Sequence, residues 1–170
     1  MDEVQFWRLA EQARATGGID CDEHHDTLLD RLKALPPEDI IVFDRIFGVL
    51  LRRAYRRDLK EAYGTMTGSG SDDGFTDFRS WLIGQGRAVY EKALANPDSL
   101  VEVDLLGDED AKCEQLTYAA LHAYEEKTGQ EMPDHARMPI TTLGQKLTDE
   151  ELLRAMPKLC RKYGFYSEQD

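Results

Sequence analysis

The chain lacks a long apolar run: no stretch approaches the roughly 18 consecutive apolar residues of a membrane-spanning helix. Its N-terminus, MDEVQFWRLAEQ, is acidic and lacks the cationic start and apolar core of a signal peptide. These absences predict a cytoplasmic protein with no membrane partner. A length of 170 residues and a hydrophobic content of 41% predict one globular domain over residues 1–170 with a sizeable core.

Cysteine is also scarce. The three cysteines are an odd number and show no C-x-x-C spacing, so we expect neither a disulfide framework nor a structural zinc site. Cys113 and Cys160 lie among apolar neighbours of predicted helices. We interpret both as small buried hydrophobic residues.

Motifs for metal or cofactor chemistry are missing as well. His24 and His25 are adjacent on a predicted helix and therefore point about 100° apart, whereas a helical metal site uses positions i and i+4. We interpret them as part of a solvated polar face; His122 and His135 complete no ligand set or triad either. The chain has no G-x-S-x-G, H-E-x-x-H, Walker or Rossmann pattern. We expect no metal and no cofactor.

Positive charge is in short supply. Lys and Arg number 21 against 33 Asp and Glu, and the net charge of −12 argues against a nucleic-acid partner. Residues 44–60 are the local exception, with six cations and two acids, Asp44 and Asp58. They form either a solvated helix face that offsets the negative helix end or a patch for an acidic protein partner or anionic ligand. On the second interpretation, the partner-binding candidates are Arg52, Arg53, Arg56 and Arg57.

What the chain does have is helical periodicity. The pattern predicts an all-α fold, a single-domain bundle of about six to seven helices around a long central helix. Asp2 with Gln5, and Thr148 with Glu151, resemble capping boxes. Residues 98–109 and 130–147 read as loops, with a short extended piece over 100–106. The expected helices cover residues 2–15, 22–35, 37 to about 63 (the central helix), 74–86, 87–95, 111–127, 148–156 and 159–165.

Residues 71–90, SDDGFTDFRSWLIGQGRAVY, are the most informative stretch because they combine aromatics around Arg79 with the closely spaced Gly84 and Gly86. Adjacent Asp72 and Asp73 suit a helix cap, a general acid–base pair, or a set of magnesium ligands together with Asp77. Gly84 and Gly86 favour close helix packing over a backbone clamp. The ligand-binding candidates of this stretch are Asp72, Asp73, Arg79, Trp81, Gln85 and Tyr90.

Arg79 needs a partner if its helix faces the core, because burying a lone charge is very unfavourable. Asp44, on the central helix, is the expected structural partner, and contact with a ligand is the alternative. We expect Phe47, Leu51, Phe78 and Leu82 to belong to the core.

Several segments together match the pattern of one family. They are FW at 6–7, FDRIF at 43–47, LLRRAYRRDL at 50–59, SDDGFTDFRSWLIGQGRAVYEKALANPDSL at 71–100, YEEKTG at 124–129 and LLRAMPKLCRKYG at 152–164. In these segments the chain resembles a bacterial family known as domain of unknown function 4240. Family members usually carry W-D-L-W before the S-D-D-G, where this chain reads RDLKEAYGTMTGSG. The resemblance implies a small, soluble, mostly helical bacterial protein and no established reaction.

The sequence therefore favours a non-catalytic binding or regulatory module, with a protein partner or a small polar ligand. The alternative is an accessory enzyme that acts on a small polar substrate held by Asp72, Asp73 and Arg79, with Gln85 or Tyr90. The net charge of −12 also suits an immunity-type protein that neutralises a basic toxin. Enzymatic activity stays open at this point.

Overall fold

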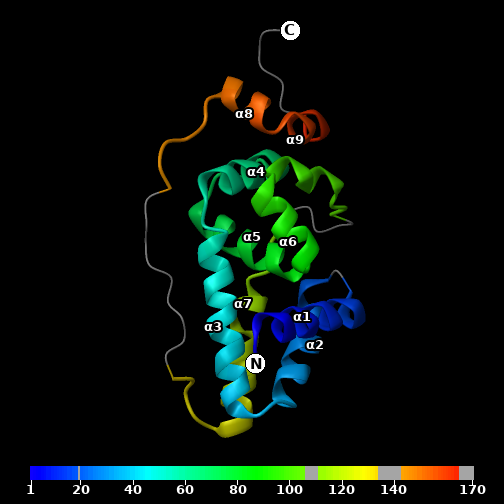
Figure 1. The fold of residues 1–170 in the computed structure, drawn as a ribbon, viewed down its shortest axis with the longest axis vertical. Helices are drawn as coiled ribbons and strands as arrows, with labels where there is room; N and C mark the ends of the chain where they lie inside the picture. The colour runs from blue at the N-terminus through cyan, green and yellow to red at the C-terminus, as the bar shows by residue number, and fades with distance from the viewer. Residues whose placement is uncertain (19, 106–110, 134–142, 165–170) are drawn as a thin grey trace.

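The fold is built from helices alone in the part of the chain that the structure describes (Figure 1). A computed structural model describes residues 1–18, 20–105, 111–133 and 143–164. The prediction of an all-α protein is confirmed. The elements are α1 (Glu3–Gly17), α2 (Cys21–Lys33), α3 (Pro37–Arg53), α4 (Arg57–Thr67), α5 (Asp72–Gly84), α6 (Arg87–Ala95), the 3-10 helix η1 (Pro97–Glu102), α7 (Gln115–Thr128), α8 (Asp149–Ala155) and α9 (Pro157–Lys162).

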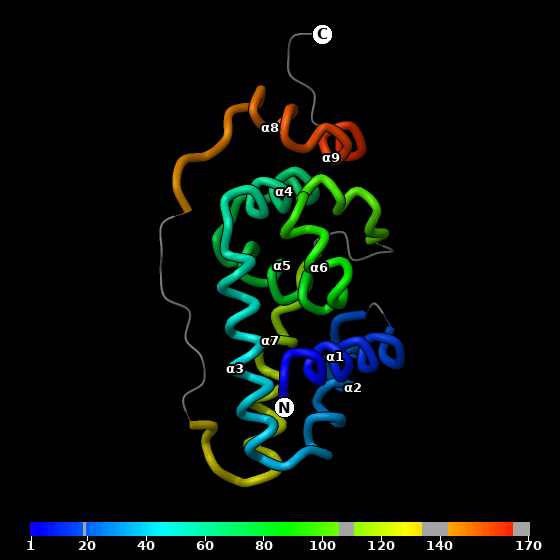
Figure 2. The backbone as a smooth tube through the Cα atoms, in the orientation of Figure 1, coloured from blue at the N-terminus to red at the C-terminus, as the bar shows by residue number. Residues whose placement is uncertain are grey.

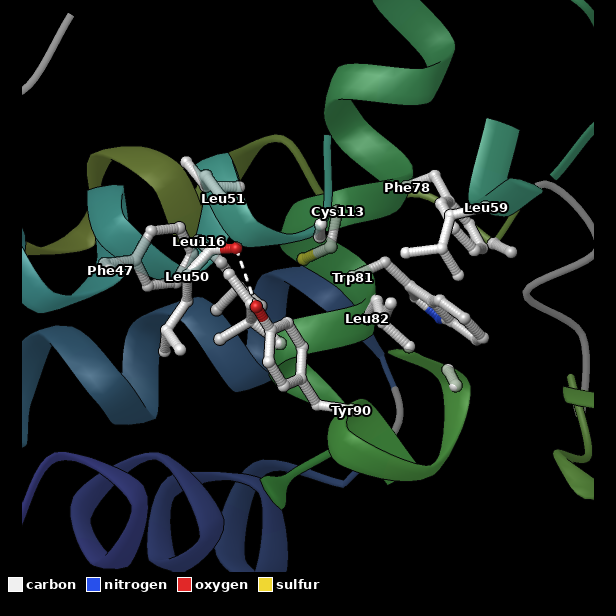
Figure 3. Close-up of a cluster of buried hydrophobic side chains, with 14 of the residues drawn as sticks. Phe47, Leu50, Leu51, Leu59, Phe78, Trp81, Leu82, Tyr90, Cys113 and Leu116 are labelled. Carbon is white, nitrogen blue, oxygen red and sulfur yellow. Dashed lines mark hydrogen bonds between the residues drawn. The ribbon is translucent and has the colours of Figure 1, made fainter. Parts of the chain in front are cut away.

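Helix α3 runs along the long axis of the molecule, as Figure 2 shows. Pro37 starts it at a position where a missing N–H is harmless. One face of α3 is buried, and the four residues predicted to form the core, Phe47, Leu51, Phe78 and Leu82, are all at most 5% exposed. Figure 3 shows them in one cluster with residues from α4, α6 and α7.

The central helix is shorter than predicted, because it stops at Arg53 and α4 begins at Arg57. Arg56 between them has extended backbone dihedrals, and the Tyr55 N–H donates to the Arg52 carbonyl at 3.1 Å, which tightens the last turn. The chain therefore bends at 54–56, and the second half of the predicted helix runs as a separate element.

Helix α2 packs along α7, and α7 also packs on α3. Small residues on α7, Ala119, Ala120 and Ala123, are buried and allow this close approach. The predicted helix over 111–127 starts only at Gln115. Ala111 has a positive φ of 47°, and the Cys113 N–H donates to the Asp77 carbonyl of α5 at 3.2 Å, so this segment follows α5 instead of coiling.

Cys21 and Cys113 form a disulfide, with their Cα atoms 5.5 Å apart. The expectation of no disulfide is therefore wrong for this pair. The two cysteines are 92 positions apart, and only the packing of α2 against α7 brings them together. Cys160 is free, and both it and Cys113 are buried, as predicted.

The C-terminal helices α8 and α9 lie at the end of the molecule next to α4 (Figure 1). The buried carboxylate of Asp98 in η1 accepts the N–H groups of Lys158 and Leu159, both at 2.9 Å, and so caps the start of α9. Residues 97–102 thus form a helical turn where a loop was expected. The capping boxes at Asp2 and Thr148 are confirmed. Residues 106–110, 134–142 and 165–170, which include His135 and parts of both predicted loops, lie outside the described residues.

Replacing Phe78 by alanine should lower the free energy of unfolding by about 3–5 kcal/mol. Its ring is fully buried, at 0% exposed, and contacts the rings of Tyr63, Phe75 and Trp81. Urea denaturation measures the change. The matched control is Val4→Ala, because Val4 is 56% exposed and should change little. Equal stability of Phe78→Ala and the unmodified protein would contradict the described core.

Candidate functional site

The two acids of the S-D-D-G motif lie in the first turn of α5. Ser71 is the N-cap, since its hydroxyl accepts the Gly74 N–H at 3.1 Å, so the prediction that Asp72 or Asp73 caps this helix is wrong. Asp72 is exposed and pairs with the ammonium of Lys60 on α4, which holds the pKa of its carboxyl below the usual range. Asp73 is exposed beside it. Both acids also complement the positive end of the α5 dipole.

Arg79 lies in the core, where only 2% of it is exposed. Its Nη1 donates to the Leu51 carbonyl of α3 at 3.1 Å, and its Nη2 donates to Thr76 Oγ1 at 3.0 Å. The guanidinium also stacks on the ring of Tyr55, 4.8 Å from the centroid. Burial lowers its pKa to about 10, while Tyr55 and then Asp77 act in the opposite direction, so it stays charged at neutral pH.

The expected acidic partner of Arg79 was Asp44. Asp44 is buried on α3, but the carboxylate whose charge raises the Arg79 pKa is Asp77, two residues earlier on α5. The guanidinium also lies at the C-terminal end of α3, where helix carbonyls carry partial negative charge. A pair between Asp44 and Arg79 stays a prediction.

Tyr90 and Trp81 are buried too. The Tyr90 hydroxyl donates to the Leu50 carbonyl of α3 at 2.7 Å, the dashed line in Figure 3, and burial raises its pKa. The Trp81 ring stacks on Phe78, with centroids 5.5 Å apart. Neither side chain is more than 4% exposed.

Gln85 is half-buried and lines a shallow cavity with Val89 and Lys92 of α6. The six ligand-binding candidates therefore divide by location: Arg79, Trp81 and Tyr90 are in the core, Asp72 and Asp73 are on the surface beside α4, and Gln85 is at the end of α5. Their role in ligand binding stays a prediction.

The glycines that follow Trp81 have structural roles. A Cβ on Gly84 would lie 2.7 Å from Leu116 Cδ1 and 3.2 Å from His24 Cε1, so α5 approaches its neighbours closely at this point. Gly86 has a φ of +92° and starts α6. The close-packing interpretation is thus confirmed at Gly84.

His24 is buried, at 3% exposed, so its assignment to a solvated face is wrong. The side chain lies against Gly84, 60 positions away in the sequence, and its ring interacts with the Ala10 backbone, so no local pattern signals its burial. Burial lowers the pKa of His24 to about 4, and the positive charge of Arg14 acts in the same direction. His25 keeps partial exposure and contacts the ring of His122, with centroids 5.8 Å apart.

A cavity of about 370 Å³ lies beside the S-D-D-G motif, between α4, the loop 68–70 and the segment that leads into α8. Its charged lining residues are Arg57, Lys60, Lys146, Glu61 and Asp149. The sequence analysis missed this cavity because its two walls are more than 70 positions apart.

The buried carboxylate of Glu61 joins the two walls of the cavity. Glu61 Oε1 accepts the Leu147 N–H at 3.3 Å and lies 3.7 Å from Arg57 Nη1. Arg57 also donates to the Gly144 carbonyl at 2.6 Å. These contacts hold the segment before α8 against α4, and so they shape the cavity.

The basic patch is largely engaged within the protein. Arg53 pairs with Glu3 at 3.3 Å, Arg56 with Asp58, and Arg57 with Glu61. Arg52 is exposed. These three arginines pair with the protein's own acids, and the use of the patch by a partner protein stays a prediction.

The described residues contain no group of three His, Cys, Asp or Glu side chains placed to hold a metal ion. Among the same residues, no helix has the length and apolar character needed to cross a bilayer.

Replacing Arg79 by methionine should lower the free energy of unfolding by about 2–4 kcal/mol, because the change removes charge-assisted hydrogen bonds and leaves the buried Leu51 carbonyl without this donor. Thermal or urea denaturation of the ligand-free protein measures the loss. Arg52→Met, at an exposed position of α3, is the control. Unchanged stability of Arg79→Met would show that Arg79 is kept for a ligand and not for the fold.

His24 makes the protein sensitive to mild acid. Its pKa falls from an ordinary 6.5 to about 4 on folding, so between these values the unfolded state binds more protons. The free energy of unfolding therefore has its full value with respect to His24 above pH 6.5. It decreases by up to about 3 kcal/mol as the pH falls to 4. Denaturation across this range should show less pH dependence in His24→Leu than in the unmodified protein, and His25→Leu should behave like the unmodified protein. Identical pH profiles for the two variants would contradict the burial of His24.

The family resemblance in the sequence is confirmed by comparison with known proteins. The model of a family described as "Protein of unknown function (DUF4240)" matches residues 1–126, from α1 into α7, and ends before α8 and α9. No curated protein and no solved structure matches the chain. Because the match covers 126 of 170 residues, the chain belongs to the DUF4240 family.

Proposed function

We propose that this chain is a non-catalytic binding protein of the bacterial cytoplasm that takes a small anionic ligand in the cavity beside α4. The observation that carries the proposal is the gathering of Arg57, Lys60 and Lys146 around one cavity in a protein whose net charge is −12. Its volume of about 370 Å³ suits a small molecule.

Two of the three cations, Lys60 and Lys146, can take up an incoming anion. Lys60 is only 14% exposed, yet its partner Asp72 is 87% exposed and can swing into solvent. Lys146 is exposed at the opposite wall. An incoming anion can therefore replace the Asp72 carboxylate on Lys60 and be approached by Lys146 from the other side.

The two acids that line the cavity, Glu61 and Asp149, do not prevent an anion from binding there. Glu61 is buried and its Oε1 is held by the Leu147 N–H and by Arg57, so its charge is largely balanced in place. Asp149 is in the first turn of α8, where the helix dipole compensates it. The mixed lining favours a small polar ligand with one anionic group over a large polyanion.

The proposal that the protein is non-catalytic is supported by the hydrogen bonds of Arg79 and Tyr90 in the core. Arg79 and Tyr90 use their polar atoms on the Leu51 and Leu50 carbonyls of α3. An enzyme built on the S-D-D-G block would have to work without these two groups, which leaves Asp72 and Asp73 on the surface as its acid–base pair.

One wall of the cavity lies outside the family match. Residues 146–152 follow the matched region, whereas α4 and the loop 68–70 are within it. We infer that relatives share the α4 wall and that ligand preference varies with the segment before α8.

Inorganic phosphate is the probe for this site. In phosphate, compared with chloride at equal ionic strength and pH, the melting temperature of the unmodified protein should rise. Lys60→Met should lose the difference because it removes the central cation. Asp72→Asn should increase the difference because it frees the Lys60 ammonium from its own carboxylate.

The control is Lys33→Met, which removes a cation of the Lys33–Glu126 pair far from the cavity. It should keep the phosphate effect of the unmodified protein. A phosphate effect that Lys60→Met retains, or no effect in either the unmodified protein or Asp72→Asn, would refute the proposal.

A further inference from the structure

The Cys21–Cys113 disulfide lies at the edge of the core and joins a partly exposed cysteine to a buried one. Cys21 is the first residue of α2 and is partly exposed, whereas Cys113 is 4% exposed. A small thiol can therefore reach the disulfide from the Cys21 side, and the leaving sulfur is the buried one.

Both sulfur atoms face hydrogen-bond acceptors that a disulfide cannot use. Cys21 Sγ lies 3.0 Å from Gln115 Oε1, and Cys113 Sγ lies 3.8 Å from the Cys21 carbonyl oxygen. The Gln115 amide is oriented for this contact, since its Nε2 donates to Asp22 Oδ1 at 3.0 Å. A disulfide has no S–H group, so these contacts become hydrogen bonds only when the pair is reduced.

His24 provides a further acceptor. It shares a space of about 10 Å³ with Cys21, Cys113 and Gly84, and its Nε2 is buried without a hydrogen-bond partner among the described residues. The ring interacts with the Ala10 backbone, and burial lowers its pKa to about 4, so it is neutral at pH 7 and Nε2 is an acceptor. An unsatisfied buried acceptor is unfavourable, and an S–H group that donates to Nε2 would remove this penalty.

We propose that Cys21 and Cys113 form a reversible dithiol–disulfide pair that exchanges with small thiols such as glutathione. The oxidised state gains the covalent bond between α2 and the segment before α7. The reduced state gains S–H hydrogen bonds to Gln115, to the Cys21 carbonyl or to His24. Each state therefore has its own stabilising contacts, as a two-state device requires.

Reduction proceeds in two balanced steps. A glutathione thiolate attacks Cys21 Sγ, the Cys21–Cys113 bond breaks, and Cys113 leaves as a thiolate that takes a proton from solvent. A second glutathione thiolate then attacks the glutathione sulfur of the mixed disulfide, and Cys21 leaves as a thiolate that is also protonated. The protein gains two electrons and two protons, and two glutathione molecules become one oxidised glutathione.

The charges around Cys21 make the exchange slow. Asp20, Asp22 and Glu23 surround the start of α2, and their negative charge repels the anionic glutathione thiolate that attacks Cys21. The pair is thus suited to record the redox state of its surroundings over time and not to act as a fast oxidoreductase.

Equilibration of the native protein in glutathione buffers of different ratio tests the proposal. After a quench with N-ethylmaleimide, mass spectrometry counts the labelled cysteines. We expect Cys21 and Cys113 to become labelled together as reduced glutathione increases, to re-form the disulfide when the ratio is reversed, and to keep the helical circular dichroism signal throughout. Buried Cys160 should stay unlabelled in both states and reports on unfolding.

The acceptors can be tested separately. His24→Leu removes the unsatisfied acceptor and should shift the ratio of disulfide to dithiol at fixed glutathione by about tenfold toward the disulfide. Gln115→Leu, at an exposed position that should not disturb folding, should shift it in the same direction by a smaller factor. His25→Leu, at the next position on α2, should leave the ratio unchanged.

Two results would overturn the proposal. A disulfide that resists reduction until Cys160 also becomes labelled is a structural cross-link. A pair that stays reduced in excess oxidised glutathione is two separate thiols. A ratio that is unchanged in both His24→Leu and Gln115→Leu would exclude the acceptors as the source of reversibility.

Discussion

The contact on which most of this fold depends is the one between the Arg79 guanidinium and the last turn of α3. Helix α3 ends at Arg53, and its Leu51 carbonyl, which a continuing helix would bond internally, accepts from Arg79 instead. Tyr90 donates to the preceding carbonyl, that of Leu50. Helices α5 and α6 thus both supply donors to the C-terminal end of α3, and a positive charge is placed where the helix dipole is negative. The bend into α4 is possible because these carbonyls keep partners inside the core.

This contact also bears on where the cavity of the proposed ligand lies. The aromatic residues around Arg79 are buried in the core. The accessible polar groups of the S-D-D-G motif are therefore the exposed acids, of which Asp72 pairs with Lys60. The bend after α3 turns α4 so that Arg57, Lys60 and Glu61 face the segment before α8. The cavity is thus a consequence of how α3 ends. The disulfide contributes no residue to the lining of the cavity. A reversible bond there is compatible with the cytoplasmic location that we propose, where persistent disulfides are rare.

Local patterns in the sequence were sufficient for the helical class, for both capping boxes and for core residues such as Phe78 and Leu82. They could not show features that depend on distant contacts. At the break after Arg53, Arg79 and Tyr90 donate to carbonyls of α3. His24 is buried against Gly84, and the disulfide joins residues 92 positions apart. Arg79 shows the limit best. An arginine among aromatics correctly indicated a buried charge, but the sequence suggested a carboxylate partner where the fold also uses a helix carbonyl.

The central claim, that Arg79 serves the end of α3 in the absence of any ligand, is tested most directly by NMR of the arginine side chains in the ligand-free protein. Exchange of the Arg79 Nε proton with solvent reports on its burial and on its bond to the Phe75 carbonyl, 3.3 Å away. We expect this proton to exchange much more slowly than that of exposed Arg52 at neutral pH. Exchange as fast as that of Arg52 would mean that the guanidinium is free in the absence of ligand, and it would contradict the account.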